Sequence, residues 1–111
     1  MGLIIRLIIS TLAVVFASKL IPGVSVDSWT TAFIVAIVLG ILNTFLKPVL
    51  QILALPITIL TLGLFYFVIN VLIIYLAANL VDGFSVANFI AALLFGFVVS
   101  LVSGILGMFL D

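Results

Sequence analysis

The stretch VLQILALPITILTLGLFYFVINVLIIYLAANLV, from Val49 to Val81, decides the fold class, because none of its residues is charged. The whole chain of 111 residues is 68% hydrophobic and only 5% charged. A soluble domain carries charges on roughly a quarter of its residues, so this composition offers no surface for water. The sequence therefore predicts an integral membrane protein that has the lipid bilayer as its partner.

Four membrane spans follow when the apolar sequence is divided outward from this stretch, since about 20 apolar residues cross a bilayer as a helix. We expect the spans near residues 3–21, 30–46, 61–81 and 89–109. Pro22 and Gly23 should end the first span, and Lys47 with Pro48 should end the second. Asp27 and Ser28 precede the second span as good N-cap residues.

The segment 47–60 is apolar but too short for a span of its own. Apolar stretches of about 10–14 residues usually lie at the interface or enter the membrane and return. We therefore interpret it as a short interfacial or re-entrant helix. In the alternative interpretation, the second and third spans are long, tilted helices that absorb the segment and turn over near Pro56.

An internal repeat is indicated by the loops that follow the first and third spans. We call the pairing of residue 20 with residue 80, and of the residues before and after them in step, the repeat alignment. It superimposes LIPGVSVDSW (20–29) on LVDGFSVANF (80–89). Both loops contain Gly-x-Ser-Val followed by an aromatic residue, which hydropathy alone does not produce. The predicted fold is an all-α integral membrane protein, a four-helix transmembrane bundle of two parallel helical-hairpin repeats. A pseudo-two-fold axis along the membrane normal would relate the repeats.

The two loops carry a structural prediction of their own. Gly23 and Gly83 can take the left-handed conformation that ends a helix, and the three residues after each glycine favour extended backbone. We hypothesise that these triplets pair as a two-stranded antiparallel ribbon with Ser25 opposite or near Ser85, because unpaired backbone at the interface is unfavourable. Two independent solvated turns are the competing hypothesis, since so short a ribbon is marginal alone.

We expect a single transmembrane domain over residues 1–111, with repeat 1 at about 3–46, a connecting segment at 47–60 and repeat 2 at about 61–110. The six charged residues of the chain are Arg6, Lys19, Asp27, Lys47, Asp82 and Asp111. Arg6 and Lys47 fall on one side of the predicted membrane, opposite Lys19. The positive-inside rule then predicts that both termini lie in the cytoplasm.

Small and polar residues recur along the spans and are the candidate site. In lipid, helices associate through close approach of small residues and through hydrogen bonds between them. The candidate residues for packing or polar function are Asn43, Lys47, Asn70, Gly40, Gly63, Gly96, Ser100 and Gly104. Asn70 stands at seven-residue spacing from Gly63, as on one helix face. Asn43 and Asn70 would either bond helices together or offer a polar contact in a pore or lipid path.

The residue types that are absent exclude several function classes. The chain has no His, Cys or Glu, and all three of its acids are Asp near span ends. We therefore expect no catalytic residue, no metal site and no cofactor. Proton-coupled transport would require a carboxylate or a His side chain at mid-membrane, and the sequence places none there. A net charge of zero argues against nucleic acid as a partner.

The centre of the chain resembles a known family. NTFLKP at residues 43–48, Leu-Pro at 55–56, LTLGLF at 60–65 and Asn70 are similar to the core signature of the mycobacterial-type four-transmembrane phage holins, superfamily IV. Gly-Phe-Ser-Val at 83–86 fits the same pattern. The resemblance covers most of the chain and implies a small protein that accumulates in the bacterial inner membrane. The family name implies opening of lesions that release endolysin, and it supplies no catalytic residues.

Two functional hypotheses follow from this resemblance and from the spans. The first is a holin-like former of lesions or pores, acting as a homo-oligomer through its small-residue faces. The second is a structural or envelope-stress accessory membrane protein that binds a partner or lipid and forms no hole. The sequence identifies no protein partner.

Overall fold

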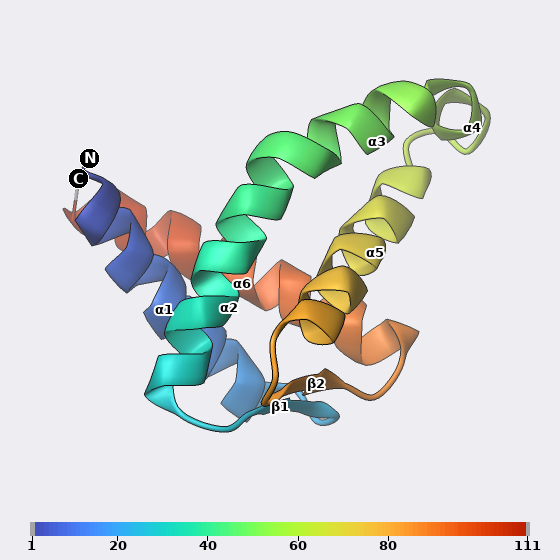
Figure 1. Ribbon diagram of the computed structural model, residues 1–111. Helices are drawn as coiled ribbons and strands as arrows, with labels where there is room; N and C mark the ends of the chain where they lie inside the picture. Colours follow the sequence, from blue (N-terminus) through green and yellow to red (C-terminus); the bar gives the residue numbers. More distant parts are fainter. Residues whose placement is uncertain (1, 111) are drawn as a thin grey trace.

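The computed structural model describes residues 2–110, in which a helix–strand–helix unit occurs near each end of the chain (Figure 1). The elements are α1 (Leu3–Leu20), β1 (Val24–Val26), α2 (Trp29–Ile41), the π-helical turn η1 (Leu42–Leu46), α3 (Lys47–Leu53), α4 (Leu55–Leu60), α5 (Phe65–Leu80), β2 (Phe84–Val86) and α6 (Phe89–Leu110). Asp111, one of the six charges counted above, lies outside the described residues.

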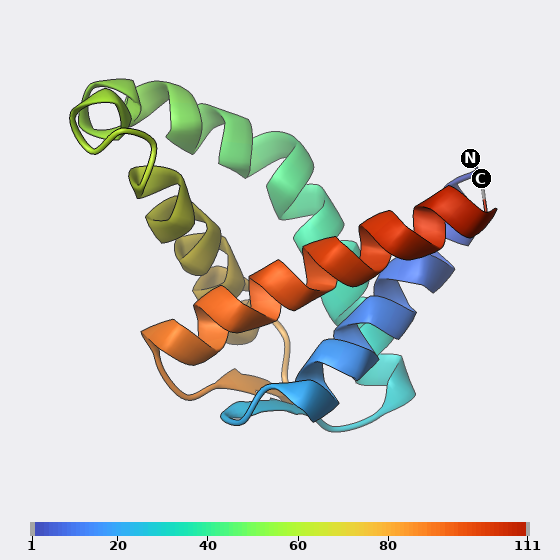
Figure 2. The ribbon, with the colours of Figure 1, turned by 180° about the vertical axis from the view of Figure 1, so that it is seen from behind.

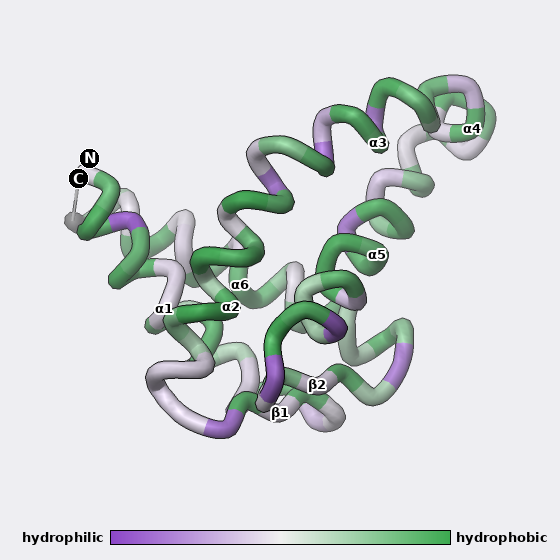
Figure 3. Tube along the Cα trace, in the orientation of Figure 1, coloured by the Kyte–Doolittle hydropathy of each residue, from purple (hydrophilic) through white to green (hydrophobic). Residues whose placement is uncertain are grey.

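Three helical runs are long and apolar enough to cross a membrane: Leu3–Leu20, Trp29–Leu53 and Phe89–Phe109. A fourth helix, Phe65–Leu80, is also apolar but has 16 residues and is therefore about 24 Å long. Hydrophobic residues dominate the helical trace, whereas hydrophilic residues gather beside the strands (Figure 3). The protein is thus a mostly helical membrane protein, as the composition predicted.

The hypothesised ribbon between the two loops is confirmed. Strands β1 and β2 pair antiparallel, with the register Val24↔Val86, Ser25↔Ser85 and Val26↔Phe84. The ladder continues beyond both strands, because the Asp27 N–H donates to the Gly83 carbonyl at 3.0 Å and the Ala87 N–H donates to the Gly23 carbonyl at 2.7 Å. The alternative of two independent turns is therefore wrong.

Equivalent residues end and begin the helices on either side of the ribbon. Gly23 and Gly83 have φ angles of 92° and 90°, the left-handed conformation expected for them. Ser28 caps α2, since its side chain accepts a hydrogen bond from the Thr31 N–H at 3.2 Å. Asn88, its counterpart in the repeat alignment, likewise accepts from the N–H three residues on, that of Ala91, at 2.8 Å.

The buried core also follows the repeat alignment. Helix α1 packs against α2 and α6, and α5 packs against the same two helices. The buried positions that match in this alignment include Ile9 and Ile69, Ala13 and Ile73, Val14 and Ile74, Ala17 and Ala77, Ile21 and Val81, Val24 and Phe84, Ala32 and Ala92, and Val35 and Phe95. The same helix faces therefore point inward in both halves.

The ribbon closes one end of the bundle, and the helices diverge toward the other end (Figures 1 and 2). The start of α1 and the end of α6 lie together on one side of that open end, where Arg6 and Ser10 share a cavity wall with Ser103 and Gly104. Helices α3 and α4 and the start of α5 form the other side. Arg6 and Lys47 thus lie toward the open end, and Lys19 lies toward the ribbon.

The second helix does not end at Leu46 as predicted. It continues through the π-helical turn and through α3 to Leu53, so that Trp29–Leu53 is one helical run. Pro48 normally disrupts a helix because it lacks an N–H and its ring clashes with the carbonyl four residues earlier. Here the Lys47 N–H donates to the Leu42 carbonyl five residues back. This wider turn lets the helix pass the proline, as π-bulges often do at irregular positions.

The third helix begins at Phe65 rather than at residue 61. Residues 61–64 form a turn in which Leu62 and Gly63 have φ angles of 56° and 91°, outside the helical region. The chain therefore turns at Ala54 and again at residues 61–64, on either side of the short helix α4 that contains Pro56. Gly63 consequently does not share a helix face with Asn70, and the predicted seven-residue stripe is wrong there.

The register of the ribbon can be tested by a disulfide, since the natural chain contains no cysteine. Ser25→Cys together with Ser85→Cys places two thiols directly opposite each other, and facing Cα atoms lie within reach of a disulfide. We expect oxidation in membranes to form a disulfide between these positions. When the chain is then cleaved between the two cysteines, the fragments should stay joined and migrate together on a denaturing gel. Ser25→Cys with Asn88→Cys is the control and should remain unlinked; equal linking of both pairs would contradict the register.

Candidate functional site

The centre of the candidate site is a hydrogen bond between Lys47 and Asn70. The Lys47 Nζ donates to the Asn70 Oδ1 at 3.4 Å, and both residues are partly buried. The residues come from α3 and α5, which pack against each other although the two positions are far apart in sequence. A carboxamide within an apolar helix is unfavourable unless it has a partner, and Lys47 provides one.

The irregular backbone before Pro48 helps to position Lys47. The π-helical turn η1 rotates the residues that follow it relative to a regular helix, and Lys47 is the first residue after the turn. Inside the turn, the Thr44 hydroxyl donates to the Gly40 carbonyl at 2.7 Å. The turn therefore brings a charged side chain to α5.

Gly96 on α6 makes room for the amide of Asn70. A Cβ at position 96 would lie 2.6 Å from the Asn70 Nδ2 and 2.7 Å from the Ile74 Cδ1, far below an ordinary contact. A larger residue at position 96 would therefore force the Asn70 amide or the Ile74 side chain to shift. Among the small residues predicted from the sequence, Gly96 has the close-packing role that such residues perform in membranes.

The side chains of Asn43 and Asn70 lie in different surroundings. Asn70 is partly buried and bonded, whereas Asn43 is exposed in the single chain. Asn43 does share the walls of a small cavity, about 40 Å³, with Asn70, Gly96 and Ser100. The cavity is large enough for a water molecule. The structure therefore brings four of the predicted residues around one polar space.

The remaining predicted residues lie apart from the Lys47–Asn70 bond. Gly40 and Gly104 are exposed, and a Cβ at either position would meet no atom within 4 Å. Ser100 is exposed and lines both the small cavity and a wider groove. Gly63 belongs to the turn before α5. Within one chain, therefore, neither Gly40 nor Gly104 makes a close contact with another helix.

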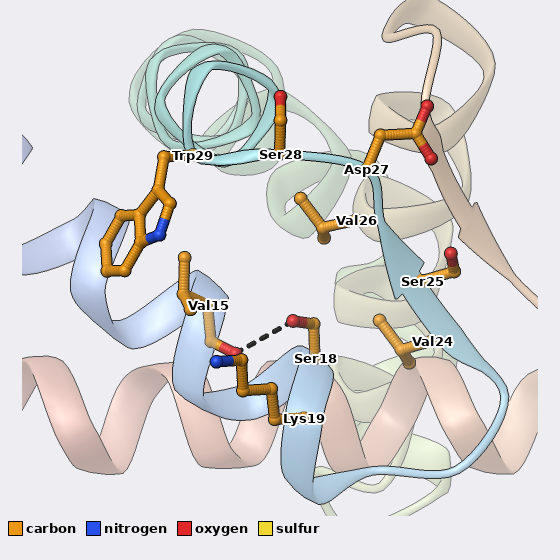
Figure 4. Close-up of a pocket in the computed structure, with 9 residues that line it drawn as sticks. All are labelled: Val15, Ser18, Lys19, Val24, Ser25, Val26, Asp27, Ser28 and Trp29. Atoms are coloured by element: carbon orange, nitrogen blue, oxygen red, sulfur yellow. Dashed lines mark hydrogen bonds between the residues drawn. The ribbon is translucent and has the colours of Figure 1, made fainter.

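A separate pocket of about 380 Å³ lies beside the ribbon (Figure 4). Its walls include Lys19, Ser25, Ser28 and the indole of Trp29. The hydroxyl of Ser18 is already used, since it donates to the Val15 carbonyl at 2.8 Å. Over residues 2–110, no group of three or more His, Cys, Asp or Glu residues could hold a metal ion.

Apolar helices joined by a short paired ribbon are consistent with a small membrane protein. Residues 1–105 match the family described as Mycobacterial 4 TMS phage holin, superfamily IV. The chain belongs to this family. The identification made from NTFLKP and the later motifs is thus confirmed.

Two relatives of this holin-family chain are bacterial proteins. An uncharacterized protein of Streptomyces coelicolor is 40% identical over 92 residues, which cover 79% of this chain and 74% of the relative. The uncharacterized membrane protein YvlD of Bacillus subtilis is 32% identical over 108 residues, covering 92% of this chain and 91% of the relative. No solved structure matches this chain.

The list of site residues drawn from the sequence omitted Arg6, Ser10 and Thr44. These residues line a groove between α1 and the α2–η1 run together with Gly40 and Asn43. The repeat alignment places Ser10 on Asn70, so the internal repeat contained the signal for Ser10. Arg6 carried no such signal, because its counterpart is Tyr66.

We expect Gly96→Ala to lower the thermal stability of the protein in detergent by about 1–3 kcal/mol, because the new methyl group must displace Asn70 or Ile74. Gly104→Ala is the matched control in the same helix, where the added methyl group meets open space. Thermal unfolding followed by circular dichroism measures both variants. Equal stability of the two variants would contradict the packing described for Gly96.

The Lys47–Asn70 bond is tested by a double-mutant cycle of Lys47→Met and Asn70→Leu. Interhelical hydrogen bonds in membranes contribute about 1 kcal/mol, so we expect a coupling of that order between the two substitutions. Asn70→Leu alone should lower the unfolding temperature, since Lys47 then loses its acceptor. Strictly additive effects would show that the two side chains do not interact.

Proposed function

We propose that this holin-family chain acts as a homo-oligomeric former of lesions or pores in the bacterial inner membrane. The observation that carries the proposal is the exposure of small and polar residues on two of the helices of one chain. Gly40, Asn43 and Thr44 on the α2–η1 run and Ser100 and Gly104 on α6 are all exposed. Small and polar residues on lipid-facing surfaces favour contacts between membrane helices.

A lesion needs polar groups that face water, and these exposed residues include the polar side chains of Asn43, Thr44 and Ser100. Elsewhere the exposed surface is formed largely by Leu, Ile and Phe side chains, which suit lipid. Lateral association of copies through Gly40 and Gly104 would bury these glycines. It would also gather Asn43 and Ser100 from several chains around one axis.

A second candidate is an accessory membrane protein, structural or linked to envelope stress, that binds a partner or lipid and forms no hole. The Lys47–Asn70 hydrogen bond favours it, because this bond lies within one chain. Polar groups that are already paired contribute less to a water-filled lesion. Neither candidate requires catalysis, and we propose that the protein is not an enzyme.

We further propose that the two helix–strand–helix units are parallel hairpin repeats related by a pseudo-two-fold axis along the membrane normal. The Ser25↔Ser85 register and the buried positions that match in the repeat alignment support this arrangement. In this proposal α5 completes a set of four spans, and residues 47–60 connect the repeats. Arg6 and Lys47 support placing both termini in the cytoplasm.

Induced expression in a bacterial host tests the lesion proposal. We expect rapid, timed loss of membrane potential and entry of a small dye. Gly104→Leu should abolish both effects, because a bulky side chain prevents close helix approach without touching the Lys47–Asn70 bond. Leu101→Ile, a substitution on the same helix that keeps the side chain apolar and of equal volume, is the control. Unchanged membrane potential at high expression would favour the accessory function.

Cysteine labelling tests the orientation. Ser25→Cys and Ser85→Cys, introduced one at a time, should both react with an impermeant maleimide added outside intact cells, since both residues are exposed on the ribbon. Arg6→Cys should react only after the membrane is permeabilised. Labelling of Arg6→Cys in intact cells would reverse the proposed orientation.

A further inference from the structure

A groove with a volume of about 610 Å³ lies between α1 and the α2–η1 run. Its polar wall consists of Arg6, Ser10, Asn43 and Thr44. The rest of the lining is apolar or small: Leu3, Leu7, Ala36, Ile37, Gly40, Ile41 and Phe45. The groove thus combines a cation and hydrogen-bond donors with a hydrocarbon-like floor.

A second groove between α5 and α6, about 440 Å³, provides an internal comparison. In the repeat alignment, its residues Phe67, Asn70, Gly96, Phe97 and Ser100 correspond to Leu7, Ser10, Ala36, Ile37 and Gly40 of the first groove. The second groove contains no charged residue. The two grooves thus share five matching positions, and only the first has a charged residue, Arg6, in its lining.

The electrostatic surroundings of Arg6 favour an anion. The two carboxylates that the structure describes, Asp27 and Asp82, adjoin the ribbon, at the opposite end of the bundle. Arg6 is exposed and also lines the neighbouring cavity with Ser10, Ser103 and Gly104. An exposed guanidinium at the edge of hydrocarbon has an unfavourable energy unless it reaches headgroups or binds an anion.

We propose that the α1–α2 groove binds one anionic phospholipid, with its phosphate at Arg6 and an acyl chain along the apolar floor. Basic pockets between membrane helices bind anionic headgroups in this way. The Ser10 hydroxyl and the Asn43 amide supply further donors to the phosphate oxygens. Ile37, Ile41 and Phe45 supply the apolar floor for the chain.

A phospholipid fits this groove better than a soluble anion, because most of the lining is apolar and the groove lies between membrane-spanning helices. A free phosphate would leave Leu3, Leu7 and Phe45 without a partner. The site does not depend on lesion formation, since every lining residue comes from one chain. It would serve an accessory protein equally well.

The test is native mass spectrometry of the full chain in detergent, titrated with dioleoyl phosphatidylglycerol or with dioleoyl phosphatidylcholine. We expect one phosphatidylglycerol to bind more tightly than phosphatidylcholine. Arg6→Gln should weaken phosphatidylglycerol binding about fivefold or more, since one basic residue contributes about that factor near an anionic surface. Lys19→Gln changes the net charge equally and should leave the affinity unchanged, because Lys19 lies beside the ribbon, away from the groove.

Two further variants separate the groove from general effects. Ile37→Trp keeps every charge but fills the groove, and it should displace the bound lipid; thermal unfolding checks that both this variant and Arg6→Gln remain folded. Phe97→Trp makes the same change in the uncharged groove and should have no effect. Equal weakening by Lys19→Gln, or retention of lipid by Ile37→Trp, would overturn the proposal. Thermal stabilisation by inorganic phosphate as strong as that by the lipid would overturn it in favour of a soluble anion.

Discussion

Backbone groups at the edge of a hydrocarbon layer need hydrogen-bond partners, and the loops after α1 and α5 meet this need by pairing with each other. Neither triplet could form a stable ribbon alone, because a two-stranded ribbon of this length is marginal in water. Helix ends that already lie close together remove most of the entropic cost of pairing. The Ser25↔Ser85 register in turn fixes how the two pairs of helices meet.

Much of the packing follows from that register. Once Gly23 faces Ala87 and Gly83 faces Asp27 across the ribbon, positions that match in the repeat alignment occupy comparable surroundings in the two halves. Alanine is fully buried at position 17 and again at position 77, where helices approach closely. Larger residues replace smaller ones elsewhere, as with Val35 and Phe95, so the two halves are similar without being identical. The Phe95 ring packs against Phe84 of the ribbon, with centroids 5.3 Å apart.

Composition was sufficient to predict the membrane class. The internal repeat and the extended-backbone preference of the two triplets indicated the ribbon and its register, with two independent turns as the alternative. Helix boundaries were less predictable at the prolines. Pro48 is an ordinary stop signal, but the preceding π-helical turn accommodates it, and hydropathy contains no signal for such a turn. The start of α5 was missed because Leu62 and Gly63 lie in a stretch as apolar as a span while their backbone is not helical. Lys47 and Asn70 were both identified as candidates, but their contact depends on α3 packing against α5, and hydropathy and spacing contain no signal for that packing.

The differences between the two halves carry more functional information than their similarity. At matching depths, one half has Asn70 with Lys47 as its hydrogen-bond donor, and the other has Ser10 with Arg6 on the same groove wall. The carboxamide accepts its bond inside the chain, where Gly96 allows close helix approach, so this side of the bundle is locked by its own side chains. Ser10 and Arg6 face an open groove instead, and their donors can reach a molecule from the bilayer. The equivalent positions Ser10 and Asn70 therefore differ in their surroundings: the Asn70 amide is paired with Lys47 within the chain, whereas Ser10 lies beside Arg6 on a groove that is open to the bilayer.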